Sequence, residues 1–443
     1  MSDNREGFGS RLGFILVAAG CAIGLGNVWR FPFITGQYGG AAFILIYLLF
    51  LLIFGFPILV MEFTVGRASQ RGVGKAFNIL EKPGHKWHYA GVPMIVGNYL
   101  LMMFYTTVTG WMLYYFYRMV TMGDLMGMSP EQVGSAFGEM LGNGPLLCFW
   151  MIVATFLGLS IVALGVKRGV EGVTKIMMVA LLFIMLLLVV RVLTLPGAGE
   201  GVRYLIRPDF SKLTASAVAA AVGQGFFSLS LGMGIVITYS SYVKPSENLV
   251  ASGTGTAIAD LLFALLAGFA VMPAVFAAGI EPAAGPGLVF ETLPYIFAKM
   301  GVDLPFLSAV AAFLFFAALL IAALTSSISL TEVCVAYLVE ERGLKRGWAC
   351  LLTFLVTWLL GLCCVFGPGV LDFLDSFSSN VLMTLGGLLC VVFVGWIMPR
   401  QDVQDELTNG GTVNRRTFRL LYFLMRYLAP LAVLSIFLSN LVW

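Results

Sequence analysis

The chain has 443 residues, of which 59% are hydrophobic and 11% are charged, and its formal net charge at pH 7 is +3. Soluble domains carry about 25% charged residues, so this composition, with a mean hydropathy of +0.94, excludes a water-soluble globular protein. It predicts a protein embedded in a lipid bilayer, and the weak, scattered positive charge excludes a nucleic-acid partner.

Long apolar runs predict an all-α, multi-pass membrane protein. A helix needs about 20 apolar residues to cross the hydrocarbon core of a bilayer. By this measure we expect eleven spans, in a single domain that covers residues 1–443. The expected spans lie near residues 11–36, 41–66, 89–120, 146–164, 170–194, 216–242, 250–277, 305–338, 347–366, 371–398 and 418–441.

The basic residues predict the orientation of these spans. If residues 1–10 lie inside, most of the 26 Lys and Arg residues fall on the inner side, as the positive-inside rule requires. An odd number of spans then gives a cytoplasmic N-terminus and an external C-terminus. No clear signal-peptidase site follows the first apolar run, so we expect it to remain as a span. The short termini are typical of a bacterial cytoplasmic membrane protein.

Glycines interrupt two spans at matching places. The first span contains "GCAIGLGN" at residues 20–27, and the sixth contains "GQGFFSLSLGMG" at residues 223–234. If spans 1–5 (residues 11–194) and spans 6–10 (residues 216–398) are two repeats, each break lies in the first helix of its repeat. An odd number of helices per repeat inverts the second relative to the first, and such paired breaks point to a transporter's binding site. The last span, 418–441, lies outside the repeats.

Each of these glycines alone would be explained by close packing between helices. In "GLGN" and "SLGMG", however, two glycines flank one residue, which favours local unwinding. Unwound backbone in a membrane must face a cavity. There its carbonyl groups bind cations and the N-termini of half-helices bind anions. A zwitterion such as an amino acid matches both kinds of group.

Four motifs in the expected order identify a family. They are "GNVWRFPF" at residues 26–33, the glycine break of the sixth span, "GPGLVFETLP" at residues 285–294 and "ALTSSIS" at residues 323–329. Over nearly the whole chain they resemble the neurotransmitter:sodium symporters, in the bacterial amino-acid transporter branch. The resemblance implies a 5+5 inverted-repeat core with broken helices 1 and 6 plus one extra helix. It also implies sodium-coupled symport of neutral L-amino acids by alternating access.

The resemblance implies two sodium sites. The first site comprises Ala22, Asn27, Ser228 and Asp260. The second site comprises Gly20, Ile23, Ala322, Thr325 and Ser326. Asp260 stands where the bacterial leucine transporter has asparagine, and a carboxylate in the middle of a span is by default a functional hypothesis. The alternative for the hydroxyl groups of the second site is hydrogen bonding within their own helix.

The same resemblance predicts no chloride requirement. Tyr47, Gln224 and Ser228 match three positions that bind chloride in animal members of the family, but Ala264 replaces the remaining serine. Asp260 would supply the negative charge directly beside the first sodium ion.

The substrate site implied by the resemblance is largely apolar. It comprises Ala22, Gly24, Leu25, Gly26, Leu101, Tyr105, Phe226, Phe227, Ser228, Ser230, Met233, Ser326, Ser329 and Leu330. Monoamine transporters carry aspartate at the position of Gly24, so glycine there favours a substrate with its own carboxylate. We therefore expect a hydrophobic or aromatic amino acid. Ordinary helix packing is the alternative explanation for the apolar residues.

Charged pairs are the expected gates. Arg30 and Asp375 would close the outer side, and Arg5 would pair with Glu340, near Tyr242, on the inner side. Glu62 is interpreted as a structural carboxylate that binds backbone amides freed by the breaks. The sequence has no nucleotide loop, zinc motif or catalytic triad, so we expect no enzyme. The alternative function is a sodium-dependent amino-acid sensor without sustained transport. Besides the amino acid, the expected partners are membrane lipids.

Overall fold

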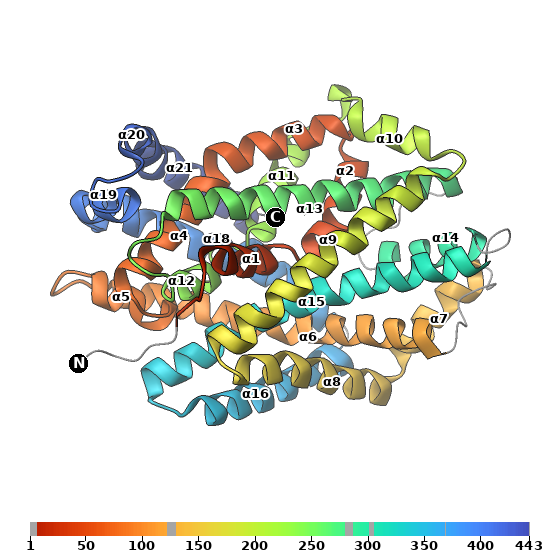
Figure 1. Ribbon diagram of the computed structural model, residues 1–443, viewed down its shortest axis with the longest axis horizontal. Coiled ribbons are helices and arrows are strands. Elements are labelled where there is room, and N and C mark those ends of the chain that lie inside the picture. Colours follow the sequence, from red (N-terminus) through yellow and green to blue (C-terminus); the bar gives the residue numbers. More distant parts are fainter. Residues whose placement is uncertain (1–6, 122–129, 280–286, 301–304, 368, 443) are drawn as a thin grey trace.

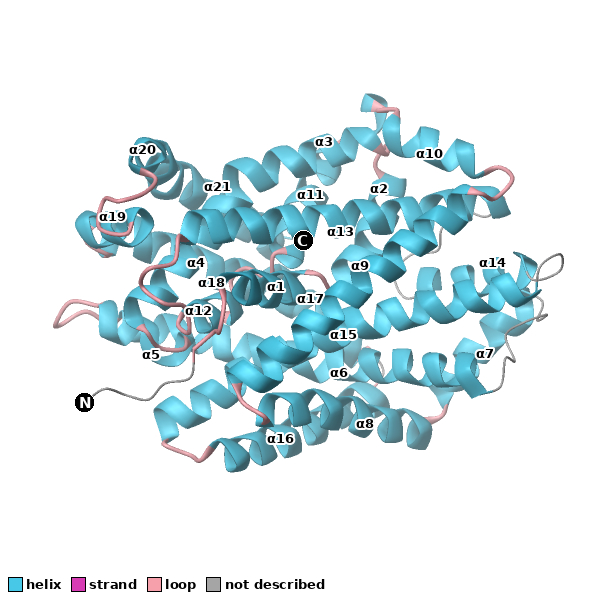
Figure 2. Cartoon of the chain, in the orientation of Figure 1, coloured by secondary structure: helices cyan, strands magenta, loops and turns pink. Residues whose placement is uncertain are grey.

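The computed structural model describes residues 7–121, 130–279, 287–300, 305–367 and 369–442, and these residues form a bundle of helices (Figure 1). The only β contact among them is one isolated bridge between Gly40 and Pro208, and Figure 2 shows helices joined by short loops. The predicted all-α class is therefore confirmed. Arg5, one of the predicted inner gate residues, lies outside the described residues.

The helices follow one another closely along the chain. The first part of the chain forms α1 (Arg11–Ala22), α2 (Phe31–Gln37), α3 (Ala41–Phe50), α4 (Phe56–Ser69), α5 (Val73–Leu80), α6 (Gly91–Thr121), α7 (Pro130–Gly142), α8 (Gly144–Ala163), α9 (Gly172–Leu193) and α10 (Ala198–Ile206). The second part forms α11 (Ala215–Ser228), α12 (Ile235–Ser240), α13 (Leu249–Ala278), α14 (Leu293–Met300), α15 (Pro305–Arg342), α16 (Arg346–Phe366), α17 (Val370–Ser376), α18 (Met383–Val392), α19 (Arg400–Thr408), α20 (Arg415–Phe423) and α21 (Ala429–Val442). Short π-helical segments connect several of these helices within continuous spans.

The number of spans differs from the expectation of eleven. Among the described residues, nine helices are long and apolar enough to cross a membrane, and a bent pair raises the count to ten. The difference is the sixth predicted span, residues 216–242. It consists of α11 and α12, and each of these helices is too short to cross alone. The multi-pass prediction is confirmed, whereas the division into two repeats stays a prediction.

The first break bends the chain by 58° between α1 and the helix that continues over Gly26–Gln37. Helix α1 ends at Ala22 because Ile23 adopts an extended conformation, with φ −78° and ψ 91°. A π-helical segment, Gly26–Arg30, then starts the second half-helix. Broken α1 packs against both α13 and α15, so the interruption lies inside the bundle (Figure 1).

The second break separates α11 from α12. Here Ser230, Gly232 and Gly234 all have positive φ angles, of 52°, 80° and 72°. At Gly232 the backbone touches α18 so closely that an added Cβ would lie 1.9 Å from the carbonyl oxygen of Met383. Only glycine fits this position, so the motif "SLGMG" is required by both conformation and packing.

Candidate binding site at the helix breaks

The centre of the candidate site is the carboxylate of Asp260 on α13, whose side chain is 0% exposed. Asn27, just after the first break, donates from Nδ2 to Oδ1 of Asp260 at 2.7 Å and to its carbonyl oxygen at 3.2 Å. Ser228 Oγ, at the end of α11, lies 2.8 Å from both carboxylate oxygens. Tyr47 on α3 donates its hydroxyl to Oδ2 at 3.4 Å. One carboxylate thus joins both broken helices.

All of these hydrogen-bond partners are neutral. Within the described part of the chain, no Lys, Arg or His forms an ion pair with Asp260. A buried ionised carboxylate without a charged partner is strongly unfavourable. The geometry therefore suits a small cation held by hard oxygen ligands, and three of the four residues predicted for the first sodium site, Asn27, Ser228 and Asp260, are in mutual hydrogen-bond contact.

The residues predicted for the second sodium site lie at the end of α1 and on α15, and these two helices are in contact. Ser326 Oγ donates to the carbonyl oxygen of Cys21 at 3.4 Å, across the two helices. Thr325 instead donates to Ile321 and Ala322 of its own helix, at 3.1 and 3.0 Å. The alternative interpretation, a hydroxyl bonded within its helix, thus describes Thr325 in this structure. Its oxygen keeps lone pairs that can accept a cation.

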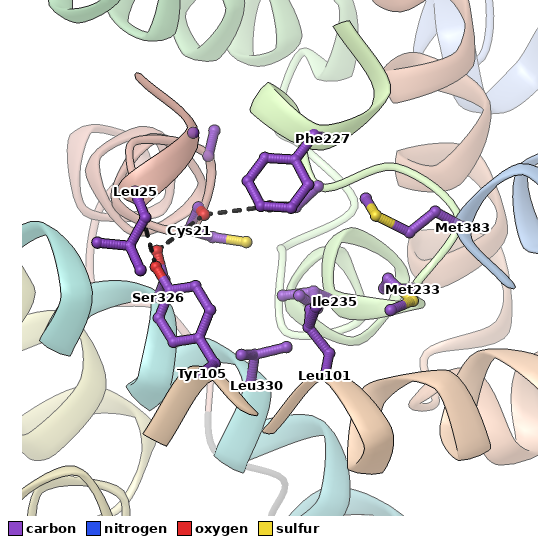
Figure 3. Close-up of a pocket in the computed structure, with 14 residues that line it drawn as sticks. Cys21, Leu25, Leu101, Tyr105, Phe227, Met233, Ile235, Ser326, Leu330 and Met383 are labelled. Atoms are coloured by element: carbon purple, nitrogen blue, oxygen red, sulfur yellow. Dashed lines mark hydrogen bonds between the residues drawn. The ribbon is translucent and has the colours of Figure 1, made fainter. Parts of the chain in front are cut away.

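A cavity of about 30 Å³ lies beside the two breaks. It is lined by Cys21, Ala22, Gly24, Leu25, Gly26, Leu101, Tyr105, Phe227, Ser230, Met233, Ile235, Ser326, Leu330 and Met383. Figure 3 shows Leu25 and Met383 on opposite sides of it. This space holds only a few water-sized molecules, so an amino acid enters only if flexible side chains of the wall, such as Met233 and Met383, shift.

Three predicted substrate residues do not line this cavity. Phe226 packs against Phe50, with ring centroids 6.2 Å apart. Ser329 donates to the carbonyl of Thr325 and accepts from the Tyr239 hydroxyl, both at 2.9 Å. Ser228 belongs to the Asp260 cluster instead. Conversely, Cys21, Ile235 and Met383 line the cavity without having been predicted. Cys21 lies inside the motif "GCAIGLGN" and Ile235 directly follows "SLGMG", whereas no motif in the sequence indicates Met383.

Two glycines of the first break are closely surrounded. A Cβ added to Gly24 would lie 2.7 Å from Ser326 Oγ and 2.9 Å from the Tyr105 hydroxyl. A Cβ on Gly26 would lie 2.4 Å from Cδ1 of Phe227. The Tyr105 hydroxyl also accepts from the Leu25 N–H at 3.5 Å. The break therefore exposes backbone to the cavity at positions where a side chain does not fit.

The predicted outer gate residues line a second, larger cavity. This space of about 330 Å³ contacts Arg30, Tyr105, Phe227 and Asp375. Arg30 lies over the Phe227 ring, 5.1 Å from its centroid, and Asp375 accepts from Ser379 Oγ at 3.2 Å. Among the described residues Arg30 and Asp375 form no ion pair. Leu25, Tyr105 and Phe227 line both cavities, so these side chains lie between the inner space and the outer one.

On the predicted cytoplasmic side, Glu340 accepts from the Gly72 N–H at 2.8 Å. The predicted gate residue Tyr242 donates its hydroxyl to Glu332 at 2.9 Å. Glu332 is 0% exposed and forms an ion pair with Arg346 at 2.5 Å. Sequence reasoning missed this pair, although a carboxylate inside the apolar run "SLTEVCVA" is the kind of signal that marks one.

Glu62 on α4 supports the second break. Its Oε1 accepts from the Gly232 N–H at 2.6 Å, and the side chain is 0% exposed. The carboxylate therefore satisfies a backbone amide that unwinding has removed from the helix, which is the contact predicted for it.

A bundle of membrane-spanning helices, broken beside a buried polar cluster and a central cavity, defines a membrane transporter. Residues 5–125 and 139–443 match the family model described as "Sodium:neurotransmitter symporter family". The chain belongs to this family, and it is therefore a sodium-dependent transporter and not an enzyme.

Individual relatives cover almost the whole chain. The sodium-dependent transporter YhdH of Bacillus subtilis is 36% identical over 97% of this chain and 96% of its own length. A sodium-dependent transporter of Haemophilus influenzae is 34% identical over 99% of both chains. The crystal structure of MhsT in complex with L-phenylalanine superposes with a TM-score of 0.89 at 38% identity, covering 99% of this chain and 100% of that one.

Proposed function

We propose that the protein imports neutral, hydrophobic or aromatic L-amino acids together with sodium, by alternating access and without chloride. The observation that carries this proposal is the Asp260 cluster, in which a buried carboxylate meets Asn27 and Ser228 at 2.7 and 2.8 Å. A sodium ion there compensates the carboxylate's charge. Because both contacting residues belong to broken helices, the ion also holds the two breaks in one arrangement.

The substrate binds beside this first sodium ion. Its carboxylate faces the start of the second half-helix at Gly26 and the Tyr105 hydroxyl, where backbone N–H groups favour an anion. Its ammonium group faces carbonyl oxygens at the break, such as that of Ala22. Gly24 has room for no side chain, so no carboxylate of the protein replaces that of the substrate.

The apolar cavity walls support a hydrophobic substrate. Leu101, Leu330, Met233 and Met383 line the cavity, and methionine adapts its shape to differently sized ligands. The related MhsT was crystallised in complex with L-phenylalanine, which agrees with a pocket of this chemistry.

The second sodium ion is assigned to the site between α1 and α15, at Gly20, Ile23, Ala322, Thr325 and Ser326. Chloride is not needed, because Asp260 already supplies a negative charge at the first site and Ala264 has no hydroxyl group to bind chloride. In the plasma membrane of a bacterium, with the N-terminus cytoplasmic and the C-terminus external, the inward sodium gradient drives uptake.

The test is uptake of radiolabelled L-phenylalanine into proteoliposomes, with an inward gradient of sodium or of potassium. We expect accumulation above equilibrium only with sodium. Asp260→Asn keeps the shape but removes the charge, and we expect the sodium affinity to fall by about tenfold to a hundredfold, the range for one charged contact. Asp402→Asn is the matched control, because Asp402 is exposed on α19.

Two results would contradict the proposal. Sodium-dependent binding without accumulation would favour the alternative, a sensor. If Asp260→Asn takes up the amino acid with unchanged sodium affinity, Asp260 does not bind the first sodium ion.

A further inference from the structure

Arg426 is an arginine within a membrane span, Arg415–Leu438. Its guanidinium lies 5.0 Å from the centre of the Trp396 ring, 5.8 Å from that of Tyr427 and 6.0 Å from that of Tyr422. Nη1 also donates to the Tyr422 hydroxyl at 3.2 Å. The charge is thus enclosed by aromatic rings, on a helix that the proposed transport mechanism does not use.

The position of Trp396 indicates how deep Arg426 lies in the membrane. Its indole N–H donates to the carbonyl oxygen of Arg426 at 3.0 Å, and its side chain is 55% exposed. Trp396 is next to the last residue of the span Val370–Ile397, and tryptophan is enriched at the border between hydrocarbon and head groups. Because Trp396 lies at the end of its span and is hydrogen-bonded to Arg426, the backbone of Arg426 is placed at a similar depth, near the membrane surface.

The positive charge at this place lacks a compensating carboxylate. Arg400, at the start of α19, has its guanidinium carbon 5.3 Å from the centre of the same Tyr422 ring. Neither Arg400 nor Arg426 forms an ion pair with any described Asp or Glu, and Nε of Arg426 is buried without a hydrogen-bond partner. Glu406 of α19 pairs with Arg67 instead. Two guanidinium groups that share one ring repel each other unless an anion lies between them.

Arg419 extends this positive region along the helix. Arg419, Tyr422 and Arg426 are separated by three and four residues, so they lie on one helix face, and Arg419 is exposed. We call Trp396, Arg400, Arg419, Tyr422 and Arg426 the arginine–aromatic cluster. Apolar side chains on the same helical span are also exposed, 50% for Phe423 and 69% for Leu431. A ligand at this cluster meets positive charge and the exposed Phe423 ring near the surface, and Leu431 deeper in the membrane.

We propose that the arginine–aromatic cluster binds the head group of an anionic phospholipid. The phosphodiester accepts hydrogen bonds from Arg426 and Arg400, the glycerol and the remainder of the head group lie toward Arg419, and the acyl chains follow Phe423 and Leu431. Guanidinium groups bind phosphate oxygens bidentately, and basic pockets between membrane helices on the cytoplasmic side select anionic lipids. Such a lipid links α19 and the end of the span Val370–Ile397 to the span Arg415–Leu438.

The test compares lipids on the full-length protein, purified in detergent and depleted of lipid. Binding of dioleoyl-phosphatidylglycerol and of dioleoyl-phosphatidylcholine is titrated by native mass spectrometry, and thermal unfolding is measured with each lipid and with inorganic phosphate. We expect one retained phosphatidylglycerol, bound at least about tenfold more tightly than phosphatidylcholine. We also expect thermal stabilisation that inorganic phosphate does not reproduce, because phosphate lacks the acyl chains.

Variants locate the site. Arg426→Gln should lower the phosphatidylglycerol affinity by about fivefold or more, since one arginine near a membrane surface contributes about that factor. Arg400→Gln, at an exposed position whose loss does not threaten folding, should give a similar loss. Arg168→Gln is the matched control, because it removes the same charge from an exposed position in the segment Val166–Glu171, outside the cluster.

Three outcomes would overturn the proposal. Equal affinity for the two lipids would show that binding does not require a lipid with a net negative charge. An equal loss in Arg168→Gln and Arg400→Gln would show that the effect comes from general surface charge and not from this cluster. If inorganic phosphate stabilises the protein as much as phosphatidylglycerol does, the cluster binds free phosphate rather than a lipid.

Discussion

Replacing Gly24 by alanine tests whether the backbone at the first break must approach its neighbours this closely. The added Cβ would lie 2.7 Å from Ser326 Oγ and 2.9 Å from the Tyr105 hydroxyl. Ordinary contacts of a Cβ begin near 3.4 Å, so both hydroxyl groups must move away. Each of them is tied to the break, Ser326 through the carbonyl of Cys21 and Tyr105 through the Leu25 N–H.

The size of the effect follows from this crowding. Overpacking by one methyl group in a closely packed interior costs about 1–3 kcal/mol, which corresponds to roughly a fivefold to 150-fold change in an equilibrium constant. Because the strain is confined to the residues that line the cavity, we expect this factor in the apparent affinity for L-phenylalanine. It should appear in equilibrium binding at saturating sodium and equally in the KM for uptake.

Gly223→Ala is the control for this prediction. Gly223 lies in α11, and a Cβ there would meet nothing within 4 Å. We expect unchanged or slightly higher stability, because alanine is the better helix former by about 1 kcal/mol. If Gly24→Ala binds L-phenylalanine with the affinity of the wild type, the close approach at Gly24 does not shape the substrate site, and the reasoning is wrong.

Three further predictions concern buried charges. Glu62→Ala leaves the Gly232 N–H buried without its partner and should cost about 1–3 kcal/mol of stability in thermal unfolding, whereas Glu62→Gln, which keeps an acceptor, should lose clearly less. Arg346→Gln leaves Glu332 buried without a cation and should cost roughly 3–5 kcal/mol in chemical unfolding; exchanging both residues for glutamine should restore most of it. Replacing chloride by gluconate at fixed sodium should leave the uptake rate unchanged, because Asp260 supplies the negative charge.

Each of these predictions has an opposing result. Equal destabilisation by both Glu62 variants would show that the acceptor oxygen is unimportant and that the loss comes from packing. A double glutamine variant no more stable than Arg346→Gln would show that Glu332 is not the source of the cost. Uptake that falls when chloride is replaced would contradict the proposed role of Asp260.

The breaks and the buried carboxylate were predictable from local sequence. Paired glycines around one residue indicate unwinding, and the positive φ angles at Gly232 and Gly234 agree with it. Asp260 interrupts a long apolar run, where an uncompensated charge is too costly to be incidental. Among the described residues, helix length and composition alone give nine or ten spans, because the sixth span is divided, as predicted, into two helices that are individually too short.

Contacts between distant elements were less predictable. Met383 reaches the cavity because α18 packs against the backbone of Gly232, and no spacing rule connects residues that far apart. Thr325 shows the converse: its hydroxyl lies where a sodium ligand is expected, yet it donates within its own helix. Residue type therefore identifies groups able to bind an ion, but only the three-dimensional arrangement shows what they contact.

The position of Asp260 gives a physical reason for coupling two ligands. Its carboxylate contacts Asn27 after the first break and Ser228 before the second, and each contact fails if one half-helix tilts away from the other. A sodium ion is held well only when both residues face the carboxylate, so it favours the arrangement in which the breaks enclose the cavity. An amino acid that fills this cavity favours the same arrangement. In the proposed mechanism each ligand therefore raises the population of the arrangement to which the other binds, in addition to the contact expected between the substrate carboxylate and the first sodium ion.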